Sequence, residues 1–99
     1  MDDAPKPVVG QVTILNREGF HSRPVMRFVE LAQSFNARIR VSAADGSKEV
    51  DGKSAMELML LGAAAGTTLR ISADGPDAES AIQALAHLVK ARFKPRSNP

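Results

Sequence analysis

One short segment, Gly19 to Pro24, contains the residue types that phosphoryl transfer requires. His21 supplies an imidazole, and neutral imidazole is a nucleophile at physiological pH because its unperturbed pKa is about 6.5. Arg23 adds a guanidinium, which matches the geometry of phosphate oxygens. Pro24 suits a first helical turn and Ser22 suits an N-cap, so a helix should begin at about residue 23. The free N–H groups and the dipole at that helix start favour an anion beside the imidazole.

This arrangement is what a transient phosphohistidine at His21 needs, with Ser22 and Arg23 as the phosphate cradle. The competing interpretation is a plain surface histidine in a loop, with Ser22 and Pro24 doing no more than starting the helix. From this segment alone we favour the surface histidine, because short motifs give many false positives.

A second segment of interest opens at Ser54, whose spacing to Glu57 is that of a capping box. A short helix should follow to about Leu61, and Gly62 can end it. We expect Leu58 and Leu61 to enter the core and the two methionines to face outward as an adaptable docking patch. Those methionines are Met56 and Met59. The alternative is that they fill gaps in the core.

Hydrophobic periodicity and turn signals divide the rest of the chain into alternating strands and helices. The expected strands span 8–15, 37–44, 47–51 and 67–73, and the expected helices run from about 23, from 55 to about 61, and from about 77 to about 93. Asp45-Gly46 suits a two-residue type I′ turn between the second and third strands.

Alternating strands with one polar face predict an antiparallel sheet that is covered on one side only. The residues expected to face the core are Val12, Ile14, Ile39, Val41, Ala43, Leu69, Ile71 and Ala73, and those expected to face away include Arg38, Arg40, Ser42, Thr68, Arg70 and Ser72. We therefore predict an α+β fold, an open-faced β-sandwich of four antiparallel strands with three helices on one face (βαββαβα). One domain should span 8–93, with a disordered lead-in at 1–7 and a disordered tail at 94–99.

Composition excludes several classes of protein. The 99 residues contain no cysteine, so neither a disulfide framework nor a thiolate metal site can form, and we expect no metal or cofactor. The 13 basic and 11 acidic side chains lack the strong basic excess of a nucleic-acid binder. The longest apolar run, 58–65, is too short to span a bilayer. The acidic start does not resemble a signal peptide, so we expect a soluble cytoplasmic protein.

Gly19 to Pro24 is similar to the active-site loop of the HPr family, the histidine-containing phosphocarriers of the phosphoenolpyruvate-dependent phosphotransferase system. The similarity continues through 51–56, 59–62 and 71–75, in the same order and at the same spacing, and covers about residues 8–93. It implies that enzyme I phosphorylates His21 on Nδ1 and that His21 then donates to enzyme IIA domains. Arg23 would contact the phosphoryl group. The chain would be a monomer that forms brief complexes and is not itself an enzyme.

The resemblance also implies further roles. Ser54 matches the serine that a dedicated HPr kinase/phosphorylase phosphorylates in some members, and this regulatory role is compatible with its role as a cap. The family meets its partners with the short helix beside the histidine. The expected docking residues are Phe20, Arg27, Ala55, Met56 and Met59. Two departures from the family pattern flank the nucleophile: Ser22 replaces an alanine and Phe20 replaces a leucine.

Three alternatives come from other readings of the same features. Gly52-Lys53-Ser54 resembles the end of a P-loop, but five residues separate Gly46 from Gly52 where that motif needs four. The order βαββαβ is also that of the RRM, which stacks RNA bases on aromatic residues of its strands, yet the four phenylalanines fall on helices or a loop. Within the HPr family, the acceptor could belong to a regulatory or nitrogen branch without sugar uptake.

Overall fold

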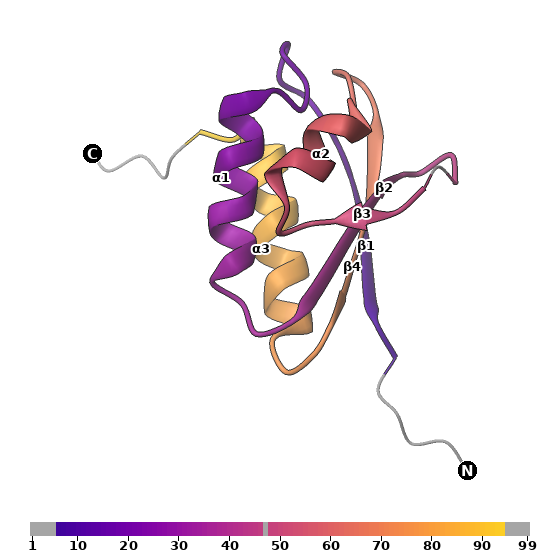
Figure 1. Cartoon of the computed structure of the whole chain (residues 1–99), viewed down its shortest axis with the longest axis vertical. Helices are drawn as coiled ribbons and strands as arrows, with labels where there is room; N and C mark the ends of the chain where they lie inside the picture. Colours follow the sequence, from indigo (N-terminus) through magenta and orange to yellow (C-terminus); the bar gives the residue numbers. More distant parts are fainter. Residues whose placement is uncertain (1–5, 47, 95–99) are drawn as a thin grey trace.

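The computed structural model describes residues 6–46 and 48–94. Its strands are β1 (Val8–Thr13), β2 (Arg38–Ala43), β3 (Val50–Asp51) and β4 (Thr68–Asp74), and its helices are α1 (Ser22–Gln33), α2 (Ala55–Leu61) and α3 (Ala78–Lys90). The strands form one antiparallel sheet in the order β1-β4-β2-β3, and the three helices lie on one side of it (Figure 1). The predicted α+β open-faced sandwich is confirmed.

The two central strands show why the sheet has one covered and one open face. Ile39 and Val41 of β2 and Leu69 and Ile71 of β4 are buried, whereas the arginines between them are exposed. Those exposed arginines are Arg38, Arg40 and Arg70. Alternation along each strand therefore sorts the side chains as predicted. Ser42, expected to face solvent, is only 4% exposed, and Ala43, Thr68 and Ser72 are half-buried.

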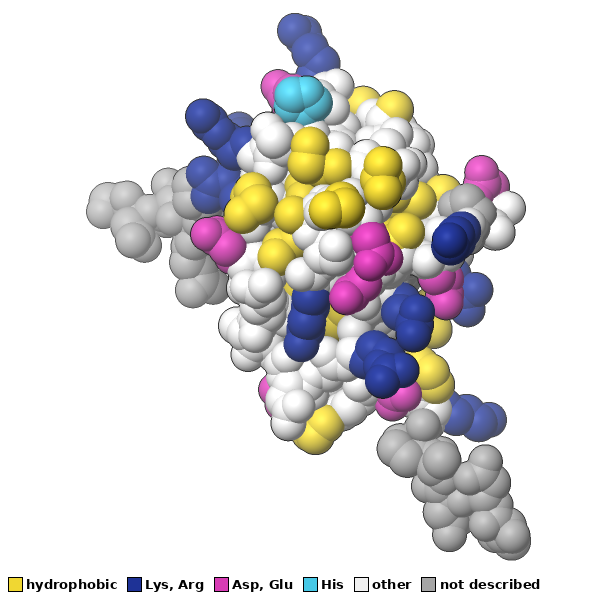
Figure 2. All heavy atoms as spheres, in the orientation of Figure 1, with side chains coloured by type: hydrophobic (Ala, Val, Ile, Leu, Met, Phe, Trp, Pro, Cys, Tyr) yellow, Lys and Arg dark blue, Asp and Glu magenta, His cyan; other side chains and the backbone are white. Residues whose placement is uncertain are grey.

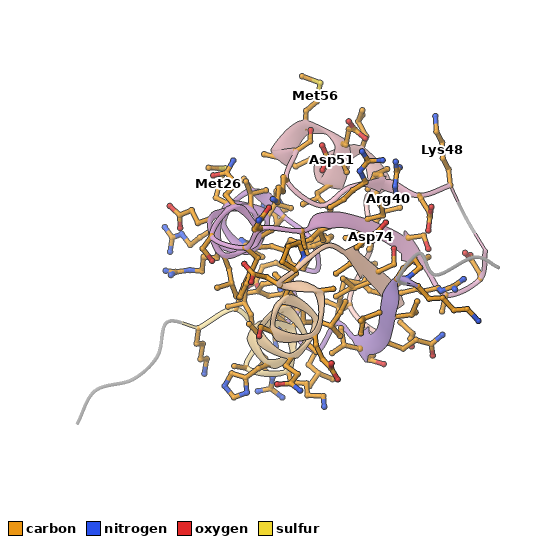
Figure 3. All side chains as sticks on the ribbon, turned by 90° about the horizontal axis from the view of Figure 1, so that it is seen from below. Met26, Arg40, Lys48, Asp51, Met56 and Asp74 are labelled. Carbon is orange, nitrogen blue, oxygen red and sulfur yellow. The ribbon has the colours of Figure 1, made fainter. Side chains whose placement is uncertain are left out.

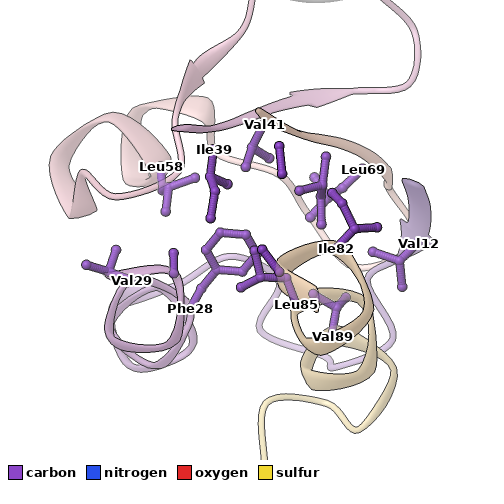
Figure 4. Packing of buried hydrophobic residues seen from close by; sticks show 14 of the residues in the cluster. Val12, Phe28, Val29, Ile39, Val41, Leu58, Leu69, Ile82, Leu85 and Val89 are labelled. Carbon is purple, nitrogen blue, oxygen red and sulfur yellow. The ribbon is translucent and has the colours of Figure 1, made fainter. Parts of the chain in front are cut away.

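The core lies between the sheet and helices α1 and α3. Phe28 of α1 and Leu85 of α3 meet under the strands, and Leu58 of α2 closes the core beside Val29 (Figure 4). The sheet and α3 approach closely at Gly10, where a Cβ atom would lie 2.7 Å from Ile82 Cγ2. A residue without a side chain is therefore needed at this point of β1.

The connection between β2 and β3 differs from the predicted two-residue hairpin. The pairing of Val41 with Val50 has the register that a turn centred on Asp45-Gly46 would produce. However, the described turn is closed by a bond from Gly46 N–H to Ala43 O, and β3 contains only two residues. Ser47, which was expected to open β3, lies outside the described residues.

The two predicted tails are described only in part. Residues 1–5 and 95–99 lie outside the described ranges, whereas Lys6 and Pro7 are exposed. Lys94, expected in the tail, donates its N–H to Ala91 O at 3.2 Å. None of the helices in residues 6–46 and 48–94 is long and apolar enough to cross a membrane.

Candidate functional site

His21 occupies the N-cap position of α1, so the helix begins at Ser22, one residue earlier than the predicted start at about residue 23. Its backbone is extended (φ −102°, ψ 179°), and its carbonyl accepts the first intrahelical bond from Val25 N–H at 2.8 Å. Ser22 is therefore the first helical residue and not the N-cap, which corrects the prediction. The helix begins early because Pro24, which has no N–H, is suited to any position of the first turn. The imidazole is exposed and makes no capping bond with the helix.

The loop before His21 is held by bonds to a distant segment. Phe20 N–H donates to Ala63 O at 2.8 Å, and the Asn16 side-chain amide donates to Gly19 O at 2.8 Å. Gly19 has φ +68°, and a Cβ atom there would lie 2.7 Å from Ala63 O. Only glycine satisfies both the left-handed backbone and this close approach. The position of His21 is thus set by backbone contacts with the segment after α2.

Phe20 does not belong to the exposed docking surface that was predicted. Its side chain is 5% exposed, and its ring packs edge-on against Phe28 at 5.4 Å between centroids. A second ring, that of Phe93, lies 5.7 Å away. Burial of these large apolar rings stabilises the fold, and the edge-on contact between two of them adds to that stabilisation. Phe20 therefore anchors the loop that carries His21, and the docking role is withdrawn.

An open cavity of about 500 Å³ lies beside His21. It is lined by Asn16, Glu18, His21, Ser22, Arg23, Pro24, Arg27, Arg92, Phe93 and Lys94. Four of these side chains are basic and one is acidic, so the cavity is electropositive. The N–H groups of Ser22 and Arg23 belong to the first turn and have no acceptor among the described residues. The predicted cradle of Ser22 and Arg23 is thus part of a larger basic site.

Glu18 is the one carboxylate on the cavity wall. A hydrogen bond from its own backbone N–H is the main reason that its pKa is lowered, and a bond from the Asn16 amide adds to the effect. The positive charges of Arg17 and His21 contribute in the same direction. Glu18 is fully exposed, so these contacts lower its pKa while its charge remains in solvent.

A hydrophobic patch adjoins the site and combines residues of two helices. Figure 2 shows hydrophobic side chains gathered over α1 and α2, next to a histidine. The exposed residues that make up this docking patch are Met26, Met56, Met59 and Leu60, which are 49%, 73%, 49% and 78% exposed. Met26 of α1 and Met56 of α2 both point outward (Figure 3). The predicted orientation of the two α2 methionines is confirmed, and Met26 and Leu60 were not foreseen.

The other side chains of α2 follow the predicted division in part. Leu58 is fully buried, and Leu61 and Ala55 are half-buried against the core. Arg27, on α1, is also half-buried and lines the cavity beside His21, apart from the exposed hydrophobic residues.

Ser54 caps α2 as predicted. Its hydroxyl accepts from Glu57 N–H at 3.2 Å, and Gly62 ends the helix with φ 63°. The carboxylate of Glu57 does not return the bond to Ser54 N–H, as a full capping box would, but accepts from Asp51 N–H at 3.0 Å. The cap therefore also ties α2 to β3. Ser54 is half-buried.

Several cavity residues were missed because their signals are not local. The sequence predicts only a loop at Asn16 and Glu18, and only a helix end and a tail at 92–94. The alternating basic-aromatic-basic pattern of 92–94 is the one signal that could have suggested an anion site. Within residues 6–46 and 48–94, no group of acidic or histidine side chains is arranged to hold a metal ion.

Comparison with known proteins shows which family the chain is similar to. The sequence model of one family, described as "PTS HPr component phosphorylation site", matches residues 8–91. The phosphocarrier protein HPr of Cupriavidus necator is 37% identical over 81 residues, which cover 82% of this chain and 89% of that protein. The multiphosphoryl transfer protein of Escherichia coli O157:H7 is 37% identical over 93 residues, covering 91% of this chain and 25% of that protein.

A solved structure shows the same fold. The crystal structure of HPr-C-His from Thermoanaerobacter tengcongensis superposes with a TM-score of 0.82 at 36% identity. The match covers 91% of this chain and 99% of that one.

Proposed function

This chain belongs to the HPr family of phosphocarrier proteins of the phosphotransferase system, and from that premise we propose that His21 accepts a phosphoryl group from phosphorylated enzyme I and passes it to enzyme IIA domains. The observation that carries the proposal is the placement of an exposed imidazole at the start of α1, on the wall of an electropositive cavity. The same site could serve a regulatory or nitrogen branch, which differs only in the final acceptor.

The transfer itself asks little covalent chemistry of the protein. The lone pair of His21 Nδ1 attacks phosphorus, a P–N bond forms, and the bond to the donor atom breaks with its electron pair returning to the donor. Catalysis is then a matter of position and charge. Arg23 and the free N–H groups of Ser22 and Arg23 stabilise the negative charge on the equatorial oxygens. Passing the group onward repeats the step in the opposite direction.

The docking patch of Met26, Met56, Met59 and Leu60 supplies the surface that brings partners to His21. Flexible methionine side chains adapt to differently shaped partners, which suits a carrier that must meet both a donor and acceptors. A carrier must release each partner quickly, so we propose that the chain acts as a monomer that forms brief complexes. We propose a cytoplasmic location from its membership of the HPr family.

As a second part of this proposal, phosphorylation of Ser54 regulates the docking of partners. It is half-buried at the start of α2, and Met56, two residues later, belongs to the docking patch. A phosphate placed there by an HPr kinase/phosphorylase would be tolerated at the helix N-terminus while adding negative charge beside that patch.

The direct test is to incubate the chain with phosphoenolpyruvate and enzyme I and to measure its intact mass. We expect one added phosphoryl group that is acid-labile, absent in His21→Ala and retained in His87→Ala, since His87 is exposed on α3 and outside the cavity. Subsequent addition of an enzyme IIA domain should remove the group. An unmodified wild-type chain in the presence of a competent enzyme I would overturn the proposal.

A further inference from the structure

Two residues just after α3 have the left-handed backbone conformation that glycine usually adopts, although neither is a glycine. Arg92 and Phe93 have φ values of 58° and 60°. Arg92 N–H bonds to Val89 O at 3.0 Å and Phe93 N–H bonds to Leu88 O at 2.9 Å, the hydrogen-bond pattern of a Schellman motif. Arg92 therefore occupies the C′ position, where a side chain is strained and glycine is strongly preferred.

Burial of the Phe93 side chain compensates for the strain of the left-handed backbone and holds this turn against the core. The Phe93 ring is 3% exposed and packs 5.7 Å from the ring of Phe20, whose neighbour in sequence is His21. The end of α3 is thus attached to the loop that carries the nucleophile, and in Figure 1 the described chain ends beside the start of α1. Arg92 and Lys94, on either side of Phe93, line the same cavity as His21.

The basic side chains at this turn suit the binding of a negatively charged group. Arg92 is exposed, and its guanidinium has no hydrogen-bond or ion-pair partner among the described residues. The cavity carries Arg23, Arg27, Arg92 and Lys94 against Glu18 alone. A phosphoryl group on histidine is close to doubly negative at neutral pH, so its charge complements this excess.

We propose that Arg92, held in the left-handed turn at the end of α3, is a second guanidinium that binds the phosphoryl group on His21. This inference rests on the proposed function, since it assigns a further residue to the same site. Arg92 acts together with Arg23 from a separate element, since Arg23 belongs to the first turn of α1 and Arg92 to the turn after α3. Two guanidinium groups from separate elements can contact different phosphoryl oxygens.

The test is to load His21 chemically with phosphoramidate and to titrate the phosphoryl group by ³¹P NMR. A nearby guanidinium favours the doubly charged form and so lowers the phosphoryl pKa. Arg92→Gly should raise the proton affinity of the group by about two- to fivefold, the size of an exposed ion pair. Arg92→Lys should retain most of the wild-type value. Lys90→Gln, which removes a charge from α3 outside the cavity, should leave it unchanged.

Arg92→Gly also separates this role from a structural one. Glycine relieves the left-handed strain at the C′ position, so the variant should unfold at the same or a higher temperature than the wild type. If His21 is phosphorylated and Arg92→Gly titrates like the wild type, or Lys90→Gln shifts the titration equally, the inference fails and the proposed function stands. If neither phosphoramidate nor enzyme I modifies His21, both fall.

Discussion

At His21, the proposed chemistry depends on an imidazole and on backbone N–H groups that have no other hydrogen-bond partner among the described residues. The imidazole makes no bond to its own helix, and the free N–H groups of Ser22 and Arg23 point from the same turn. Because Pro24 contributes no N–H, this helix start offers fewer donors than most, and the proposed phosphoryl group would depend more on the basic side chains of the cavity.

Glu18 gives a prediction that belongs to a single carboxyl group. Its folded-state pKa lies below the ordinary value of 4.5, so its contribution to stability is present above that pH and is lost as the pH falls through the folded pKa. In Glu18→Gln the contribution is absent at every pH. The urea midpoints of the wild type and of Glu18→Gln, measured from about pH 7 to about pH 2.5, should therefore converge at the acid end. A gap that persists undiminished at the lowest pH would contradict this origin.

Among the elements, α2 is the helix whose stability depends most on the residues that cap its two ends. It has seven residues, too few to be stable in isolation, and only Leu58 is fully buried. The Ser54 hydroxyl at one end accepts a backbone N–H that would otherwise be unpaired, and Gly62 at the other end adopts the left-handed conformation that ends the helix. The Ser54 cap and Leu58 therefore hold in place the helix that carries the exposed methionines of the proposed docking patch.

Removal of this cap tests the stability of α2. Ser54→Ala should lower the free energy of unfolding by about 1 kcal/mol, because Glu57 N–H loses its acceptor. Ser54→Asp should recover most of the loss, since a carboxylate both caps and complements the helix dipole. The matched control is Ser80→Ala in the first turn of α3, where no side-chain bond exists among the described residues. Equal effects of Ser54→Ala and Ser80→Ala in urea unfolding would argue against the cap.

For the whole molecule, the decisive feature is that α1, α2 and the end of α3 converge at one end of the sandwich. The docking patch takes Met26 from α1 and its other members from α2, and the cavity takes Arg23 from α1 and Arg92 from the turn after α3. Neither surface exists on any one element. The open sheet face, with its three exposed arginines, lies on the other side of the sheet and is not continuous with the site.

The docking patch predicts a loss of transfer without a loss of fold. Met56→Lys combined with Leu60→Lys should reduce kcat/KM for phosphorylation by enzyme I by about fivefold or more, as charging the centre of an interface typically costs over 1 kcal/mol. The unfolding midpoint should not fall, since both side chains are exposed. Val9→Lys is the control, because Val9 is 45% exposed on β1, away from the patch. An equal reduction with Val9→Lys would refute the role of the patch.

The sequence alone determined the alternation of strands and helices, the helix that starts near Pro24, the cap at Ser54 and the outward methionines of α2. These features depend on local interactions, within a few residues, and local periodicity records them. The tertiary structure alone decided that Phe20 is buried, that Arg92 and Lys94 reach the cavity of His21, and that Met26 joins the docking patch. Those outcomes depend on packing between residues far apart in the chain, such as Phe20 and Phe93, which no local pattern encodes.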